Sequence, residues 1–291
     1  MKNILVLMDF SSVAMNAFKY AYKLFREENL TVIHTDQYSG KNPEFIGAKP
    51  GQTKCEFLEG ELNSWIKHEL DLETLPKNIS INVLKGNPLD KIKQVCKEYT
   101  FDCLVMGTRD KYSLMDKWLG TVSLSIVKSI DIPIYVIPRY SKYTTFDQVV
   151  VSTDSNIKEN KVLEKIAKWN EDHSAFLNFL HINKDSSDEI SDETDAIVTE
   201  YFENNNYNFG FEISSTVGDD VGKTILASAY NKQANLIILL PHEQTFLNSM
   251  MINSISKQMI LSSTIPMLFM KLQKVSNKIK KKEPIKLKTN S

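Results

Sequence analysis

Residues 4–12 read ILVLMDFSS, and residues 148–155 read QVVVSTDS. In each stretch a short apolar run ends in an acid and a serine, which is the pattern of a buried strand followed by a turn into a helix. Asp9 and Asp154 hold the same place in the two copies. An internal repeat of this kind implies that one structural unit occurs twice, so it decides the fold more strongly than local propensity does.

Other matched stretches follow these two in the same order. The pairs are residues 30–34 with 176–181, 86–88 with 218–220, 102–106 with 235–240, and 132–134 with 265–267. Between them, short apolar runs alternate with longer amphipathic stretches, as strands alternate with crossover helices in a mostly parallel sheet. The sequence therefore predicts an α/β fold. We expect two tandem copies of an open, mostly parallel five-stranded sheet with helices on both faces.

The repeat also sets the domain boundaries. We expect a first domain over residues 1–142, a second over residues 146–272, and a basic tail over residues 273–291. The segment from Lys274 to Ser291 carries seven Lys and one Glu, about +6, so the rest of a chain with formal net charge -1 carries about -7. The tail has few large apolar side chains with which to offset the entropy of ordering, so we expect it to be flexible.

Composition excludes several classes of protein. A mildly acidic body lacks the clustered basic face that a nucleic-acid partner needs. Three cysteines without finger spacing predict neither a disulfide framework nor a metal site. No apolar run approaches the ~18 residues of a membrane helix, and the N-terminus lacks a signal-peptide pattern. We therefore expect a cytoplasmic protein that has no membrane partner.

Two segments are candidates for a ligand site, because an open parallel sheet binds ligands beyond the carboxyl ends of its strands, where the strand order reverses. They are residues 9–12 after the first strand, and residues 107–110 with 119–123 after the fourth. Glycines there allow backbone amides to approach an anion, and a helix beginning near Gly120 or Thr121 would present free N–H groups to a phosphate. The alternative is that Gly107 and Gly120 are only turn and cap glycines.

These segments resemble the universal stress protein family. The matching stretches are DFSS at residues 9–12, MGT at 106–108, LGTVS at 119–123 and IPIYVIP at 132–138. The resemblance extends to the second repeat through its order of elements. It implies that two such units pair across their fifth strands, here residues 133–137 and 266–270. The chain would then form an intramolecular pseudo-dimer, and a homodimer of chains is also open.

In one branch of the family, the resemblance implies, adenine nucleotide is bound at the switch point. Carried over to this sequence, the residues that would bind ATP or ADP are Asp9, Ser11, Gly107, Arg109, Gly120, Thr121, Val122 and Ser123. Asp9 would face the nucleoside. Asp110 stands where the motif of that branch has its second glycine, and a carboxylate ~4 Å from a phosphate charge is repelled by about 4 kcal/mol at an effective dielectric near 20.

The second repeat keeps none of the glycines that face phosphate. It has Pro241, Gln244 and Asn253 in that region, so we expect at most one nucleotide per chain, in the first domain. The leading hypothesis is a stress-response protein that binds a regulatory nucleotide. The alternative is a scaffold without nucleotide that acts through protein–protein interaction, with a partner that the sequence does not identify. No base or metal-binding carboxylate pair can be assigned, so we expect no catalytic residues and at most slow ATP hydrolysis.

Overall fold

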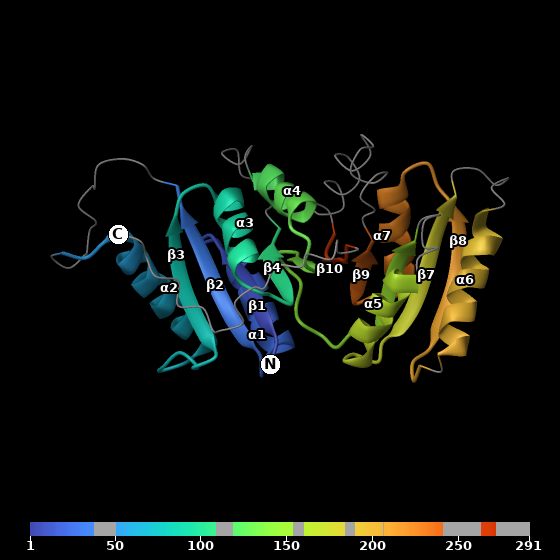
Figure 1. The fold of residues 1–291 in the computed structure, drawn as a ribbon, viewed down its shortest axis with the longest axis horizontal. Coiled ribbons are helices and arrows are strands. Elements are labelled where there is room, and N and C mark those ends of the chain that lie inside the picture. The colour runs from blue at the N-terminus through green and yellow to red at the C-terminus, as the bar shows by residue number, and fades with distance from the viewer. Residues whose placement is uncertain are drawn as a thin grey trace. The chain divides into compact units, whose positions relative to one another are not determined.

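A computed structural model of the chain describes residues 1–37, 51–108, 119–153, 160–183, 190–205, 207–240 and 263–271 (Figure 1). They fall into two compact units, the first ending at Tyr140 and the second beginning at Ser141. The expected basic tail lies outside the described residues, so its flexibility stays a prediction. The pairing of the two units and the predicted domain limits also stay predictions.

The first unit alternates strands and helices along the chain. Its elements are β1 (Asn3–Met8), α1 (Ser12–Leu24), β2 (Asn29–Asp36), α2 (Lys54–Leu70), β3 (Ile79–Lys85), α3 (Pro88–Glu98), β4 (Cys103–Gly107), α4 (Leu119–Ser129) and β5 (Ile134–Ile137). The strands lie in the order β3-β2-β1-β4-β5 and all pair in parallel. The strand order reverses between β1 and β4, which makes this the switch point of the sheet.

The apolar runs form the centre of this sheet. Ile4, Leu5 and Val6 of β1 are fully buried, as expected of a parallel strand that is covered on both faces. Helix α1 begins after Ser11, whose Oγ accepts a hydrogen bond from the backbone N–H of Ala14. This N-cap satisfies one of the helix donors that lack an intrahelical partner.

The second unit repeats the same alternation. Its elements are β6 (Gln148–Thr153), α5 (Asn160–Glu171), β7 (Phe176–Asn183), α6 (Ile190–Asn204), β8 (Phe211–Val217), α7 (Val221–Asn231), β9 (Leu236–Leu239) and β10 (Met267–Phe269). These strands also pair in parallel, in the order β10-β9-β6-β7-β8. The predicted α/β fold with open parallel sheets is thus confirmed.

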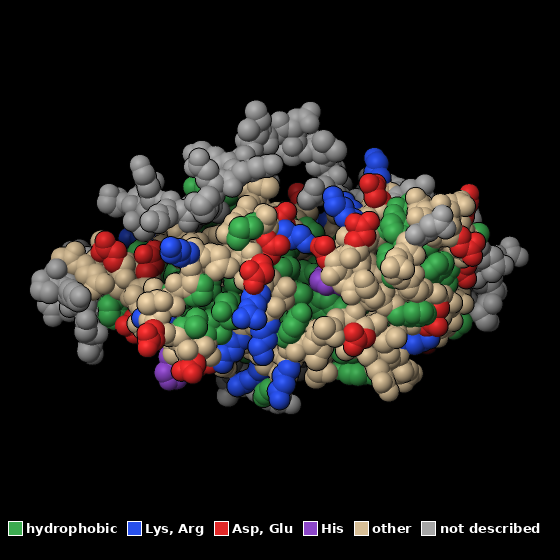
Figure 2. All heavy atoms as spheres, turned by 90° about the horizontal axis from the view of Figure 1, so that it is seen from below, with side chains coloured by type: hydrophobic (Ala, Val, Ile, Leu, Met, Phe, Trp, Pro, Cys, Tyr) green, Lys and Arg blue, Asp and Glu red, His purple; other side chains and the backbone are tan. Residues whose placement is uncertain are grey.

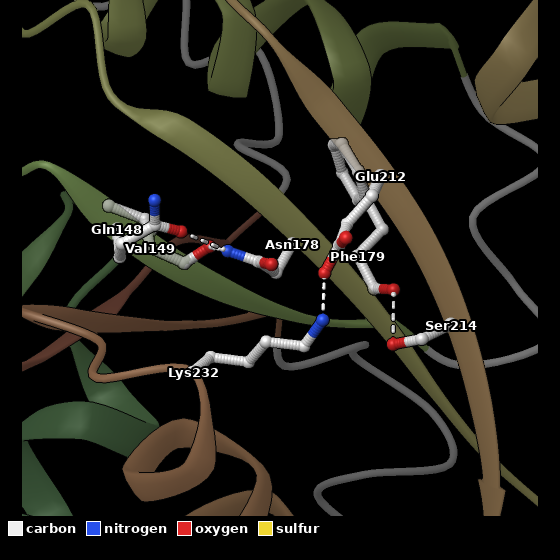
Figure 3. A network of polar contacts seen from close by, with 7 residues as sticks. All are labelled: Gln148, Val149, Asn178, Phe179, Glu212, Ser214 and Lys232. Carbon is white, nitrogen blue, oxygen red and sulfur yellow. Dashed lines mark hydrogen bonds and ion pairs between the residues drawn. The ribbon is translucent and has the colours of Figure 1, made fainter.

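A polar network joins three strands and a helix of the second unit (Figure 3). Asn178 of β7 is only 2% exposed, and its Nδ2 donates to Gln148 Oε1 at 3.1 Å and to the Val149 carbonyl at 3.4 Å. Lys232, just after α7, forms an ion pair with Glu212 of β8. Burying an amide without hydrogen-bond partners would be costly, so the two hydrogen bonds of Asn178 allow this polar side chain to be buried within β7.

On the face shown in Figure 2, Asp and Glu side chains are interspersed with Lys and Arg side chains. Within the described parts of the chain, no helix combines the length and the apolar character that crossing a membrane requires.

Candidate functional site

The turn after β1 is fixed by a short chain of hydrogen bonds. The backbone N–H of Ser11 donates to Asp9 Oδ1 at 3.1 Å, and Ser11 Oγ donates to the same oxygen. Because Ser11 also caps α1, the Asp9 carboxylate is positioned relative to both the strand and the helix. Phe10 between them has φ 57°, a left-handed conformation that is uncommon for any residue other than glycine. The strained backbone at Phe10 thus goes together with a fixed orientation of Asp9 and Ser11.

A hollow opens beside this turn, at the switch point of the sheet. It contains about 610 Å³ of empty space, with the solvent at its mouth included. Asp9 and Ser11 line one side, and Gly107, Val122 and Ser123 line another. Apolar side chains form most of the remaining wall, namely Leu7, Met8, Val13, Ala14, Ile33, Ile92, Met106 and Ile126. The structure therefore brings together five of the eight residues that sequence analysis proposed for nucleotide.

Gly107 is the last residue of β4, and α1 packs directly against it. A Cβ at this position would lie 2.8 Å from the carbonyl oxygen of Val13 and 2.9 Å from its Cγ1. Only glycine permits so close an approach of helix to strand. Gly107 is thus neither a turn nor a cap glycine: it serves helix packing and also lines the hollow.

Helix α4 reaches the hollow with its N-terminal half. It begins at Leu119, and sequence analysis placed its start near Gly120 or Thr121. The first N–H groups of a helix have no intrahelical partner and favour a negative charge nearby. For Gly120 and Thr121 the structure gives only their place in this helix, and Arg109 and Asp110 lie outside the described residues.

Two features of this region were missed by sequence analysis. One is the part of the wall contributed by β2 and α3, with Ile33, Thr35 and Ile92; β2 lies next to β1, so its carboxyl end could have been included on topology alone. The other is an aromatic stack, in which the ring of Phe10 lies 6.1 Å from Trp65 at an interplanar angle of 6° and 4.9 Å from His34. The spacing of residues along the chain does not indicate this contact, because Phe10 lies in the turn before α1 and Trp65 lies on α2.

His34 and His181 are the last residues of the matched stretches 30–34 and 176–181. His34 Nδ1 lies 2.9 Å from the carbonyl oxygen of Met8. His181 is buried, but its Nδ1 has no such partner among the described residues. The hydrogen bond is therefore present in the first copy alone. Within the described ranges, no group of three His, Cys, Asp or Glu side chains is placed to hold a metal ion.

The switch point of an open parallel sheet, where this partly apolar hollow lies, is the place at which α/β domains commonly bind ligands. Residues 1–138, which lie in the first unit, match the model of the universal stress protein family. The chain is 25% identical over 154 residues to a universal stress protein of Methanocaldococcus jannaschii, a match that covers 47% of this chain and 95% of the relative.

Solved structures resemble a larger part of the chain. A universal stress protein from Archaeoglobus fulgidus has a TM-score of 0.67 at 19% identity, and the match covers 93% of this chain and 96% of that one. A Pseudomonas aeruginosa protein described as functionally unknown has a TM-score of 0.58 at 12% identity, with 93% and 92% covered. At these identities the likeness establishes a shared fold only.

Proposed function

We propose that the first unit binds an adenine nucleotide, ATP or ADP, and that the chain uses it as a regulatory ligand in a stress response. The observation that carries this proposal is the hollow at the switch point, with a fixed carboxylate on one side and the N-terminal half of a helix on another. The carboxylate side suits the nucleoside end of a nucleotide, which is rich in hydrogen-bond donors. The helix side suits the anionic phosphate end.

The apolar wall supports the base end of the ligand. Ile33, Ile92 and Ile126 come from a strand and two helices and face the same hollow, so a flat purine would be buried between aliphatic side chains. An ionised carboxylate only accepts hydrogen bonds, and Asp9 thus suits the ribose hydroxyls or the exocyclic amine of a nucleoside. Ser11 holds that carboxylate in place through two hydrogen bonds.

The phosphate end would lie at α4. The N-terminal N–H groups of this helix form a ready anion site, and Val122 and Ser123 already line the hollow there. Gly107 keeps the neighbouring strand end free of a side chain. In the second repeat, Pro241 removes one N–H donor from the corresponding loop. We therefore propose one nucleotide for each chain.

Calorimetric titration of the full chain with ATP tests the proposal, after any nucleotide carried through purification has been released and identified by mass spectrometry. Asp9→Ala should weaken binding at least tenfold, because a hydrogen bond to a charged group contributes about 1.5–3 kcal/mol. Asp154→Ala is the matched control, since it removes the equivalent acid of the second repeat, and should leave affinity unchanged. Two sites per chain, or equal losses in the two variants, would refute the assignment. No binding by any of the proteins would favour the scaffold hypothesis.

A further inference from the structure

Aromatic rings contact the turn that follows β1. Phe10 lies between Asp9 and Ser11, which both line the hollow at the switch point, called the nucleotide hollow below. The ring of Phe10 is nearly parallel to that of Trp65 on α2, with 6.1 Å between the ring centroids and 6° between the planes. It also meets the ring of His34 in β2, edge to face at 4.9 Å. The turn is thus connected to two further elements of the first unit.

The backbone at Phe10 does not favour this turn by itself. Its φ of 57° lies in the left-handed region, which a bulky residue rarely adopts and a glycine adopts without strain. The side chain is 37% exposed, so burial of the ring offsets only part of that strain. A residue keeps such a conformation only where its surroundings hold it there. The contacts of the ring with Trp65 and His34 provide that support.

Helix α2 gives Trp65 a fixed position. Leu62 and Ile66 of the same helix are fully buried, so this part of α2 belongs to the core of the first unit. Glu59 Oε1 accepts a hydrogen bond from the backbone N–H of Val83 at 3.0 Å, which links α2 to β3. The position of the indole ring is therefore set by contacts other than the stack on Phe10.

His34 is oriented by the strand next to its own. Its Nδ1 lies 2.9 Å from the carbonyl oxygen of Met8, the last residue of β1. Because a carbonyl oxygen only accepts hydrogen bonds, Nδ1 is the donor in this contact. The bond places the imidazole ring where it meets Phe10. The second repeat has Ser155 at the position that matches Phe10, so a ring at this position is a feature of the first repeat.

We infer that Phe10 and Trp65 are positioning residues of the proposed nucleotide site: their stack keeps the turn in the conformation in which Ser11 holds the carboxylate of Asp9. The backbone N–H and the hydroxyl of Ser11 both donate to Asp9 Oδ1, and both bonds span Phe10. A change of φ at Phe10 moves Ser11 relative to Asp9, so relaxation of the strained backbone would disrupt this geometry. The inference rests on the proposed function for its effect on ATP, whereas its effect on the turn can be measured without a ligand.

Amide hydrogen exchange of Ser11, followed by NMR in the full-length chain without nucleotide, measures the effect on the turn. Phe10→Ala and Phe10→Gly both remove the ring, but only the glycine also removes the backbone strain. Both should accelerate exchange of the Ser11 N–H about fivefold after correction for intrinsic rates, a change that corresponds to about 1 kcal/mol. Phe10→Tyr keeps the ring, so the protection of the parent chain should be retained.

Two tryptophan variants test the other side of the stack. Trp65→Leu should accelerate exchange of the Ser11 N–H as Phe10→Ala does. Trp169→Leu is the matched control, because Trp169 is also partly buried and contacts the rings of Phe146 and His173, in the second unit; it should leave Ser11 unchanged. Calorimetric titration of the same chains with ATP should show affinity about fivefold weaker in Phe10→Ala and Trp65→Leu, and parent affinity in Phe10→Tyr.

The two measurements separate this inference from the proposed function. Exchange of Ser11 as slow as in the parent, in either Phe10→Ala or Phe10→Gly, would overturn the inference, because the turn would then not need the ring. Equal acceleration in Trp65→Leu and Trp169→Leu would overturn it as well; if Trp65→Leu fails to fold, the Phe10 variants decide. Faster exchange as expected in a chain that binds no ATP would uphold the positioning role and refute the proposed function. Weaker ATP binding with unchanged exchange would do the reverse.

Discussion

Replacing Gly107 by alanine tests how the first unit is assembled around its candidate nucleotide site. The new Cβ would lie 2.8 Å from the carbonyl oxygen of Val13 and 3.0 Å from its carbonyl carbon. Both atoms belong to the backbone of α1, so no side-chain rotation relieves the contact. Either the helix or the end of β4 must move by roughly half an ångström to restore ordinary packing.

The expected cost follows from this geometry. Adding a methyl group to a packed interior that must shift its backbone typically costs about 1–3 kcal/mol. The free energy of unfolding of the first unit should fall by about 2 kcal/mol, which lowers its melting temperature by about 4–8 °C for a domain of this size. Nucleotide binding should weaken as well, because α1 carries the cap that positions Asp9.

Differential scanning calorimetry of the parent and variant chains measures the change. Gly60→Ala is the matched control, since Gly60 lies within α2 and an added Cβ would meet nothing within 4 Å. Alanine is preferred over glycine in a helix interior by about 0.5–1 kcal/mol, so this control should stabilise the protein. If Gly107→Ala leaves the transition unchanged while Gly60→Ala raises it, the argument that helix packing requires Gly107 is wrong.

Two further predictions concern charge. Asp110→Gly removes a negative charge from the glycine motif, so ATP should bind more tightly, with a gain that shrinks as salt rises; calorimetry at two salt concentrations checks this, and unchanged or weaker binding contradicts it. Asp220 caps α7 by accepting from the backbone N–H of Lys223 at 3.1 Å, a bond that lowers the pKa of its carboxyl below 3.8. The ionised Asp220 cap therefore stabilises the folded chain above the ordinary pKa of its carboxyl. This stabilisation is lost as the pH falls through the lowered pKa. Asp220→Asn keeps a capping side chain but does not titrate, so its urea midpoint should fall less steeply below about pH 4 than that of the parent; equal slopes would contradict the prediction.

The fold was predictable because its strands are continuous apolar runs separated by clear turn signals. The apolar run that opens residues 4–12 lies in β1 (Asn3–Met8), and the matched stretch 102–106 largely coincides with β4 (Cys103–Gly107). Helix starts were harder to place. The stretch 185–195 is rich in Asp and Glu, a composition typical of a solvated loop, yet α6 begins within it, at Ile190. Acidic side chains are favourable in the first turn of a helix, so an acidic run does not by itself mark a loop.

The candidate site was predictable in part, for a different reason. The residues that follow β1 and β4 could be found because topology alone brings the carboxyl ends of neighbouring strands together. The close contact of Gly107 with Val13 could not, because a glycine in a sequence does not show which backbone it faces. The stack of Phe10 on Trp65 likewise depends on how α2 lies beside the sheet.

Helix α1 connects these observations, because Val13 and Ala14 of this helix form part of the wall of the nucleotide hollow. Gly107 allows the helix to approach β4 closely, and Ser11 fixes where the helix begins. Lys19 of α1 forms an ion pair with Glu69 of α2. A displacement of α1 would therefore alter both the walls of the nucleotide hollow and the contact of the helix with α2.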